Sequence, residues 1–387
     1  MTSDPSSQPL QDSVHHIPFK KVVFTGLIRD RHGRKMSKSL GNSPDPLSLI
    51  EQYGADGLRF GLIRIAPQGQ DIRYDEKQIE EGRNFCNKLW NAARFRALQG
   101  PIAKDADPYQ DLDALTPFSK WILSRLEKTR ASVDQALDAF DFSAAAQTLY
   151  DFVWNDFCAR YIEVAKAEFQ SPHSASRHST LQTCDYVLSR ILRLLHPFSP
   201  FVTEELWRLL ALGSGSIQFA SWPEVDRQAP IHDDHALVQA VFSTVDAARV
   251  LRAELNIPSS QKVPYRLLSY KNISNETLSI LSTLIHASSL ALTENALAQT
   301  PVTLTPLGEL YLLTDGLIDV PKEIQRLTKE IEKVQNDIAL TQQKLSDPLI
   351  LSKAPPDKVD AWRETANELR SKLNRLQQIL HALSSHT

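Results

Sequence analysis

The sequence predicts a mainly α-helical protein with two short α/β segments. Three observations support this fold class. Strand-forming residues occupy 22–28, apolar residues recur every three to four positions in long stretches between 76 and 255, and the same period continues from 320 to 383 on both sides of a proline-containing break. Because 387 residues exceed one ordinary core, we expect several domains.

Composition excludes several classes of protein. The net charge of −3 rules out a bulk polycation, so nucleic acid would have to bind to local basic patches. The three cysteines are widely spaced, which argues against a zinc knuckle and a disulfide framework. No apolar run reaches the roughly 18 residues that cross a bilayer. We therefore expect a cytoplasmic protein that contacts no membrane, with a disordered polar tail at 1–16 and not a signal peptide.

A candidate polyphosphate-binding loop follows the first predicted strand. We expect this strand to be buried, because its residues are β-branched and aromatic. Its residues are Lys35, Met36, Ser37, Lys38 and Ser39. The lysines supply charged donors, the serines supply neutral donors, and flanking glycines let the backbone approach a ligand. Such loops lie at the carboxyl ends of strands in doubly wound α/β sheets. A solvated lysine–serine loop is the alternative.

Two short helices are expected after this loop. Asp45 as N-cap and Pro46 as first residue predict the start of one of them. Residues 53–56 interrupt the pattern, and a second helix continues at 58–65. The expected apolar side consists of Leu47, Ile50 and Leu58.

The segment 76–96 is expected to form one long helix with an apolar stripe and a polar face. We expect Trp90 and Phe95 to pack into the core, because aromatic residues at helical spacing usually point inward. Four polar residues lie largely off the stripe: Arg83, Asn87, Asn91 and Arg94. These side chains could contact RNA or could cap and bridge helices, and both readings stay open.

A helix bundle is expected after a polar connector at 100–115. Its helices are predicted from 116 onward and at 141–168, 181–195 and 201–212. We expect Ser199 to cap the last of these helices and Pro200 to open it. His196 has no evident nucleophile or carboxylate partner in the sequence, so we expect a structural role for it at the end of the preceding helix.

The remaining sequence predicts a small α/β region and a helical hairpin. A helix at 236–255 precedes short strands at 265–270 and 310–313, which flank a helix at 278–292. Two helical arms on either side of a break at 347–357 predict an antiparallel coiled-coil hairpin.

A basic strip lies in the second arm of the hairpin. From residue 369 to the end there are three basic residues, Arg370, Lys372 and Arg375, and no acidic ones. This strip could contact RNA, or it could be a solvated face or a self-association surface.

Several motifs together resemble one enzyme family. Residues 26–30, 35–39, 41–42, 45–46 and 53–56 are similar to the second signature of class I aminoacyl-tRNA synthetases. Residues 69–73 and 84–95 resemble the valyl-tRNA synthetases in particular, as does the closing hairpin with Lys-Ala-Pro-Pro at 353–356. The segment 196–207 resembles the anticodon-binding helix bundle shared by the valyl, isoleucyl, leucyl and methionyl enzymes. The resemblance covers nearly the whole chain but only the C-terminal part of such an enzyme.

This resemblance implies an arrangement of domains. After the tail at 1–16, residues 17–75 would be the end of a Rossmann-like catalytic domain with a region that contacts the tRNA stem. Residues 76–228 would be the anticodon-binding helix bundle, 229–317 a small α/β appendage, and 318–387 a coiled-coil tRNA-binding arm.

The resemblance also implies a function. Valine–tRNA ligases use ATP to activate valine and then transfer it to tRNA(Val). Lys35 and Lys38 would stabilise charge on the phosphates, Lys38 with the larger rate effect, while Ser37 and Ser39 would add hydrogen bonds and Met36 would anchor the loop. Mg²⁺ would arrive with ATP, and no protein-bound zinc or other metal is expected.

The family's first signature, His-x-Gly-His, does not occur in this sequence. In this family, the valine pocket and the editing domain lie upstream of the matched region. We therefore expect a monomer that is inactive by itself and takes valine and ATP only with the missing N-terminal half. A non-catalytic tRNA-binding module and a coiled-coil scaffold protein are the alternatives.

Overall fold

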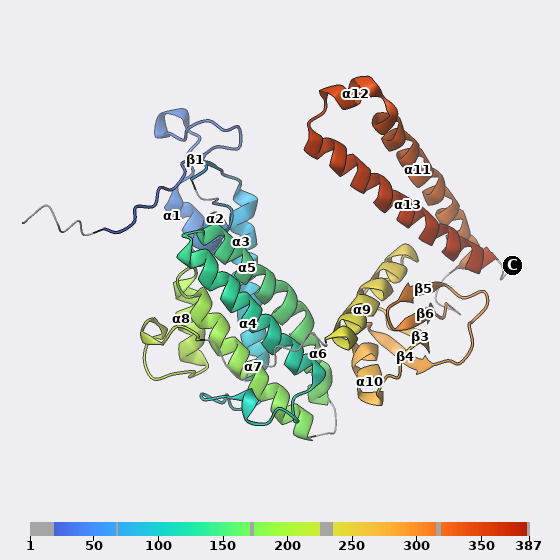
Figure 1. Ribbon diagram of the computed structural model, residues 1–387, viewed down its shortest axis with the longest axis horizontal. Coiled ribbons are helices and arrows are strands. Elements are labelled where there is room, and N and C mark those ends of the chain that lie inside the picture. Colours follow the sequence, from blue (N-terminus) through green and yellow to red (C-terminus); the bar gives the residue numbers. More distant parts are fainter. Residues whose placement is uncertain (1–18, 67–68, 171–173, 225–234, 315–318, 385–387) are drawn as a thin grey trace, which may run out of the picture. The chain divides into compact units, whose positions relative to one another are not determined.

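A computed structural model describes residues 19–66, 69–170, 174–224, 235–314 and 319–384 (Figure 1). The tail expected at 1–16 lies outside these residues. The chain divides into two compact units: residues 1–113, 122–159 and 181–230 form one unit, and residues 114–121, 160–180 and 231–387 form the other. The mainly α-helical class with small sheets is confirmed.

The first unit begins with a two-stranded parallel sheet. Strand β1 (Ile28–Arg29) pairs with β2 (Ile72–Arg73). The expectation of a buried strand at 22–28 is wrong, because Val22 and Phe24 are 69% and 80% exposed. Within the described residues this segment has only one short neighbouring strand, so no sheet face forms to cover its apolar side chains.

Helices α1 (Pro46–Tyr53) and α2 (Ala55–Arg64) follow and are separated at Gly54, as predicted. The Asp45 carboxylate caps α1 by accepting from the backbone N–H of Ser48 at 3.1 Å. The predicted apolar side is wrong in part. Leu47 and Ile50 are exposed, whereas Leu49 is the buried residue of α1.

Helix α3 (Glu76–Ala97) crosses α2 at close range. Glycines make this crossing possible, because a Cβ added to Gly82 would lie 2.3 Å from the carbonyl oxygen of Gly57. The Phe60 and Phe85 rings stack between the two helices with centroids 4.3 Å apart. This contact fixes which face of α3 points inward, so the expected burial of Trp90 is wrong: its side chain is 37% exposed.

The predicted bundle helices are present. They are α4 (Pro117–Asp138), α5 (Phe142–Asp151), the π-helical segment η3 (Phe152–Tyr161), α6 (Ile162–Gln170), α7 (Ser174–Leu195) and α8 (Pro200–Leu209). Short 3₁₀ turns lie at η2 (Pro108–Gln110) and η4 (Ile217–Phe219). The helix expected at 141–168 therefore contains a π-helical middle, which is a rare local geometry.

The N-terminus of α8 is capped from a distant helix. Pro200 opens the helix as predicted, but the Ser199 side chain makes no capping hydrogen bond. The Asp56 carboxylate of α2 instead accepts from the backbone N–H of Val202 at 2.6 Å. A carboxylate is the stronger acceptor and favours the positive end of the helix dipole. His196 has a structural environment: its Nδ1 lies 2.8 Å from Thr203 Oγ1, and burial lowers its pKa.

A buried ion pair joins α3 to α7. Arg96 Nε lies 2.7 Å from Asp185 Oδ1, and both side chains are at most 2% exposed. The guanidinium also donates to the carbonyl oxygens of Gly100 and Pro101, and the backbone N–H of Ala103 donates to the same carboxylate at 2.9 Å. This pair therefore fixes the segment after α3 onto the bundle.

The second unit contains a four-stranded sheet after helix α9 (Ala236–Glu254). The sheet order is β4-β3-β6-β5, formed by β3 (Val263–Ser269), β4 (Ala287–Leu292), β5 (Val302–Thr305) and β6 (Gly308–Leu312). Strands β3 and β4 are parallel and are connected through α10 (Asn275–Leu284), whereas β6 runs antiparallel to both β3 and β5.

The helix predicted at 278–292 is wrong in its second half. Residues 287–292 form strand β4 instead. Helix α10 ends at Leu284, and His286 adopts a positive φ of 54°, which turns the chain out of the helix. Pairing with β3 then outweighs the helical pattern, since strand pairing satisfies the backbone groups that the helix end leaves open.

The C-terminal arm is the predicted helical hairpin. Helices α11 (Val320–Ser346) and α13 (Pro356–Ser384) pack along each other, and Figure 1 shows them running in opposite directions from α12 (Pro348–Lys353). The proline-containing break thus holds a short helix of its own. The buried seam comprises Leu327, Ile331, Val334, Ile338, Ala366, Leu376, Ile379 and Leu383.

A buried carboxyl makes a pH dependence of stability predictable. Glu168 in α6 is 4% exposed and accepts from Thr180 Oγ1, and burial raises its pKa to about 7. The folded state then binds a proton that the unfolded state has released, so stability falls as pH rises from about 5 to 7. As the pH rises from 5.5 to 7.5, we expect the free energy of unfolding of Glu168→Gln to increase by about 2 kcal/mol relative to that of the wild type.

Urea unfolding at several pH values measures this effect. Glu163→Gln is the matched control, because Glu163 lies on the same helix with its side chain 43% exposed. A parallel pH profile for wild type and Glu168→Gln would contradict the assignment.

Candidate functional site: the Lys35–Ser39 loop and the candidate RNA-binding residues

A single carboxylate organises the turn that leads into the Lys35–Ser39 loop. Asp30 follows β1 and is 6% exposed. It accepts hydrogen bonds from the backbone N–H groups of His32 and Arg34 at 2.9 and 2.8 Å, and from Arg34 Nε at 2.7 Å. A hydrogen bond from Asn42, together with these bonds, holds the pKa of Asp30 well below its usual range.

Asn42 closes the other end of the loop. Its Nδ2 donates to Asp30 Oδ2 at 3.0 Å and to the carbonyl oxygen of Lys35 at 3.2 Å, while its Oδ1 accepts from the N–H of Ser37 at 2.9 Å. One amide thereby joins the entry, the middle and the exit of the loop. Gly41 adopts the left-handed conformation with φ 61°, which allows the chain to return to Asn42.

The middle of the loop is the 3₁₀ turn η1 (Lys38–Leu40). Ser37 is its N-cap, with its hydroxyl accepting from the N–H of Leu40 at 3.3 Å. The hydroxyls of Ser37 and Ser39 lie 3.1 Å apart. The structure thus brings both predicted hydroxyl donors together on one side of the turn.

The two lysines of the loop remain available for a ligand. Lys35 and Lys38 are exposed, and within the described part of the chain neither ammonium group takes part in an ion pair or hydrogen bond. Met36 is half-buried. The backbone of the loop is therefore fixed by Asp30 and Asn42 while its positive charges point to solvent, which suits an anionic ligand.

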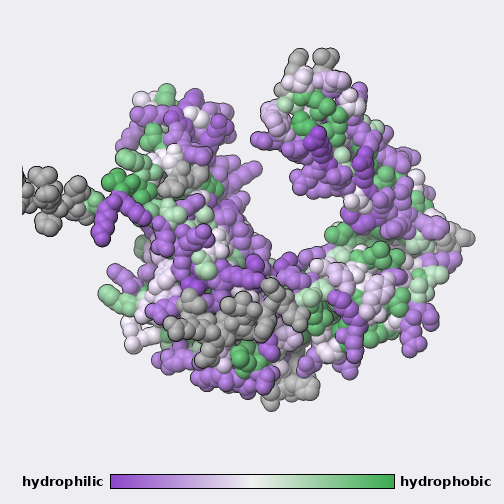
Figure 2. All heavy atoms as spheres, in the orientation of Figure 1, coloured by the Kyte–Doolittle hydropathy of each residue, from purple (hydrophilic) through white to green (hydrophobic). Residues whose placement is uncertain are grey.

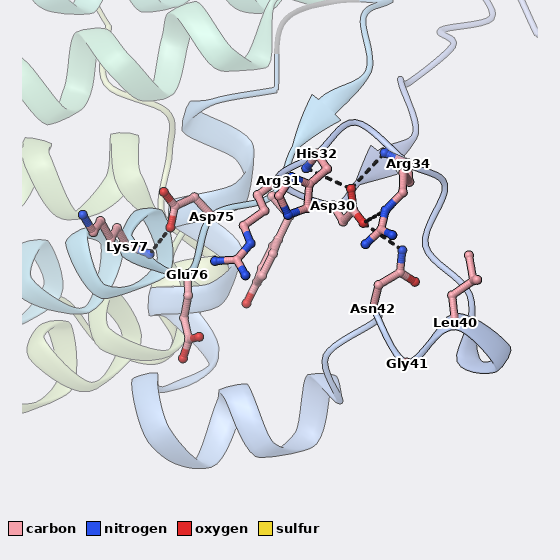
Figure 3. A pocket seen from close by; sticks show the side chains of 11 residues that line it. Asp30, Arg31, His32, Arg34, Leu40, Gly41, Asn42, Asp75, Glu76 and Lys77 are labelled. Carbon is pink, nitrogen blue, oxygen red and sulfur yellow. Dashed lines mark hydrogen bonds and ion pairs between the residues drawn. The ribbon is translucent and has the colours of Figure 1, made fainter.

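A cavity of about 660 Å³ lies beside this loop (Figure 3). On one side it is lined by Asp30, Arg31, His32 and Arg34, and on the other by the start of α3. Figure 3 shows Asn42 and Arg34 converging on Asp30 at one wall, with Glu76 and Lys77 at the opposite wall. The lining combines both signs of charge, so the cavity is polar and open to a charged ligand.

Asp30 and Asn42 received no role from the sequence. Asp30 accepts from backbone N–H groups two and four residues later in the chain. An aspartate at the start of a turn is a known signal for such bonds and could have identified Asp30. Asn42 lies twelve residues from its carboxylate partner, and no local pattern predicts that contact.

The polar face of α3 lies partly exposed. Asn87, Asn91 and Arg94 are exposed. Arg83 is half-buried, lies 3.6 Å from Glu80 and has its guanidinium over the Tyr53 ring at 5.5 Å. Three of the four predicted RNA-contacting residues are thus accessible, whereas Arg83 bridges helices. RNA contact stays a prediction for this face.

The predicted basic strip of the arm is divided by the structure. Arg370 is exposed, and none of the described residues forms an ion pair with it. Lys372 Nζ lies 2.8 Å from Glu330 Oε1, and Arg375 Nε lies 2.8 Å from Glu254 Oε1. Two of the three charges are therefore balanced within the chain. Hydrophilic side chains cover most of the visible face of the arm (Figure 2).

The described residues contain no group of three or more histidine, cysteine, aspartate or glutamate side chains placed to hold a metal ion. None of their helices combines the length and apolar character that crossing a membrane requires.

Three family models match consecutive parts of the chain. Residues 7–75 match "tRNA synthetases class I (I, L, M and V)", and residues 119–267 match "Anticodon-binding domain of tRNA ligase". Residues 319–384 match "Valyl tRNA synthetase tRNA binding arm". The Asp30–Asn42 loop lies in the first match, and the helical hairpin corresponds to the third.

Curated relatives agree with these matches. A valine–tRNA ligase of Thermotoga maritima is 38% identical over 95% of this chain and 42% of its own length. Those of Listeria innocua and Bacillus subtilis are 36% and 37% identical over 94% and 93% of this chain. A chain of the Agrobacterium radiobacter K84 LeuRS–tRNA–LeuAMS complex is 19% identical with a TM-score of 0.41, covering 67% of this chain and 28% of that one.

The chain spans about two fifths of the length of the curated relatives that it matches. The catalytic-domain match is confined to residues 7–75, and the model specific for valyl enzymes matches the closing hairpin. The chain therefore belongs to the valine–tRNA ligase family, class I aminoacyl-tRNA synthetases, and corresponds to their C-terminal part.

Proposed function

We propose that this chain supplies the Lys35–Ser39 loop and the tRNA-binding elements of a valine–tRNA ligase. In this reaction ATP activates valine as an adenylate, and the valyl group then moves to tRNA(Val). The observation that carries the proposal is a loop whose backbone is fixed by Asp30 and Asn42 while Lys35 and Lys38 stay free of partners among the described residues.

The loop suits charge stabilisation and not proton transfer. The two ammonium groups would neutralise charge that builds on the β- and γ-phosphates as the carboxylate of valine attacks the α-phosphorus. The Ser37 and Ser39 hydroxyls, 3.1 Å apart, would add neutral donors. Mg²⁺ would come with the nucleotide, coordinated mainly by phosphates and water.

The exposed segment before β1 supports a role within a larger catalytic domain. Phe19, Val22 and Phe24 are 69–80% exposed, which is unusual for three large apolar side chains close together in sequence. We propose that further strands of the catalytic domain cover them, including the His-x-Gly-His signature that this sequence does not contain.

The helical elements would bind tRNA(Val). Asn87, Asn91 and Arg94 on α3 and Arg370 on α13 are accessible donors for phosphates or bases. We further propose a cytoplasmic monomer. A coiled-coil scaffold and a stand-alone tRNA-binding module are not favoured, because the relatives at 36–38% identity are valine–tRNA ligases.

Reconstitution tests the proposal. The chain is mixed with a separately produced N-terminal part of a valine–tRNA ligase that contains His-x-Gly-His, and valine-dependent ATP–pyrophosphate exchange is measured. We expect exchange in the mixture and none with either part alone. Two results would contradict the proposed function. One is ATP–pyrophosphate exchange by this chain alone, and the other is the absence of exchange in a mixture whose two parts form a complex.

A tRNA-binding assay on the chain alone separates the two halves of the proposal. We expect affinity for tRNA that falls steeply with salt, because phosphate contacts release counterions. Binding should not depend on ATP. Affinity that does not change after deletion of residues beyond Asp319 would remove the arm from the proposal.

A further inference from the structure

Six charged side chains form one cluster where the arm meets the end of α9. Three are acidic and three are basic: Glu254, Glu323, Arg326, Glu330, Lys372 and Arg375. They come from three helices, α9, α11 and α13, and their formal charges cancel. The cluster lies within the second unit of the chain.

Glu254 is the point at which the two arm helices meet α9. It is the last residue of α9, and its carboxylate is 10% exposed. Arg375 of α13 donates from Nε to Glu254 Oε1 at 2.8 Å, and Arg326 of α11 donates from Nη2 to the Glu254 carbonyl oxygen. One residue thus binds the side chain of one arm helix through its carboxylate and the side chain of the other through its backbone.

The backbone contact has a clear physical role. The last carbonyls of a helix have no partner inside it and carry the negative end of its dipole. The Arg326 guanidinium satisfies one of these carbonyls with a charged donor. The same group bonds Glu323 Oε1 from Nε at 2.9 Å and Glu330 Oε2 from Nη1 at 2.6 Å, which fixes its orientation.

Glu330 joins the two arm helices within the cluster. It accepts from Arg326 of its own helix and lies 2.8 Å from Lys372 Nζ of α13. Both partners lower the pKa of Glu330, Lys372 most strongly. The ion pairs and hydrogen bonds therefore form one continuous network. It links Lys372, Glu330, Arg326, Glu254 and Arg375 in that order.

From this arrangement we propose that Glu254, Arg326 and Arg375 are positioning residues that set the angle of the C-terminal arm against α9, and that Arg375 and Lys372 act on tRNA through this angle and do not contact its phosphates. This inference rests on the proposed tRNA-binding function. It reassigns two of the three residues of the predicted basic strip and leaves Arg370 as the accessible member.

The length of the arm makes its base angle matter. Helix α11 has 27 residues, which at 1.5 Å per residue is about 40 Å. A rotation of 10° at the base would then move the far end by about 7 Å. This displacement is about twice the length of a hydrogen bond. A loosened base therefore lowers the effective concentration of the arm at an RNA held by the helix bundle.

Spin-label distances test the positioning role without RNA. Ser243→Cys on α9 and Gln343→Cys near the far end of α11 are both exposed, and the half-buried Cys86 is replaced by alanine. We expect a narrow distance distribution for the full chain, and a broadened one after Glu254→Ala or Arg375→Gln. Arg363→Gln is the matched control, because Arg363 pairs with Asp360 on α13 alone and is 67% exposed.

Binding of tRNA then separates positioning from contact. The proposal predicts that Glu254→Ala and Arg375→Gln each weaken binding about threefold to tenfold, and that the double variant is no weaker than either single one. If Arg375 instead contacted a phosphate, Glu254→Ala would free its guanidinium. This variant would then bind tRNA as tightly as the unaltered chain or more tightly. A phosphate contact also predicts that Arg375→Gln alone reduces the salt slope by about one.

The outcomes are distinct. Broadened distances together with matched, non-additive losses of affinity support the positioning role. Unchanged distances in both variants, or tighter binding by Glu254→Ala, overturn it. If the unaltered chain binds no tRNA, the proposed function fails, while the distance measurement still decides whether the cluster sets the arm.

Discussion

Arg96→Ala is expected to lower the free energy of unfolding of the first unit by about 3–5 kcal/mol, the cost of breaking a buried ion pair on one side. The Asp185 carboxylate is 1% exposed and would lose its charged partner. The carbonyl oxygens of Gly100 and Pro101 would lose charged donors in the same substitution. Urea unfolding followed by circular dichroism measures the loss.

Two further variants make the test specific. Arg94→Ala removes an exposed arginine two residues away on the same helix and is expected to cost less than about 0.5 kcal/mol. Arg96→Met with Asp185→Leu removes both charges and should recover most of the lost stability. A loss below about 1 kcal/mol for Arg96→Ala would show that the pair is not essential to the bundle.

Lys38→Ala is expected to slow valyl-adenylate formation by about 10²–10³-fold in the reconstituted enzyme. This is the usual effect of removing one preorganised group that stabilises developing charge. Lys38 is exposed and has no partner among the described residues, so the substitution should leave stability unchanged. Valine-dependent ATP–pyrophosphate exchange at saturating ATP gives the rate, and its ATP dependence gives KM.

Lys20→Ala is the control for this prediction, since Lys20 is an exposed lysine outside the loop. We expect Lys35→Ala to be slower than the control but faster than Lys38→Ala. A change of less than about threefold for Lys38→Ala would mean that its charge is not used in the transition state.

Local sequence patterns predicted the helices and their starts well. Asp45 and Pro46 open α1, Gly54 separates it from α2, and the apolar period from 320 to 383 gives the hairpin. These signals depend on residues three or four positions apart, so a single sequence contains all the information that they need.

The errors share a different cause. Residues 287–292 became a strand because β3 offers a partner, and residues 22–28 stayed exposed because only β2 pairs with them among the described residues. Ser199 lost its capping role to Asp56, which lies 143 positions earlier in the chain. In each case the competing or absent partner is remote in sequence.

Local motifs and helical periods were enough to predict the family and the mainly helical class, and to locate the Lys35–Ser39 loop as a candidate site. The contacts by which Asn42 and Asp30 hold that loop became visible only in the folded chain, as did the pairing of Lys372 and Arg375 with carboxylates of the chain itself. The physical reason is that the energy of a charged side chain depends on its nearest partner in space. For Arg375 that partner is Glu254, 121 positions away.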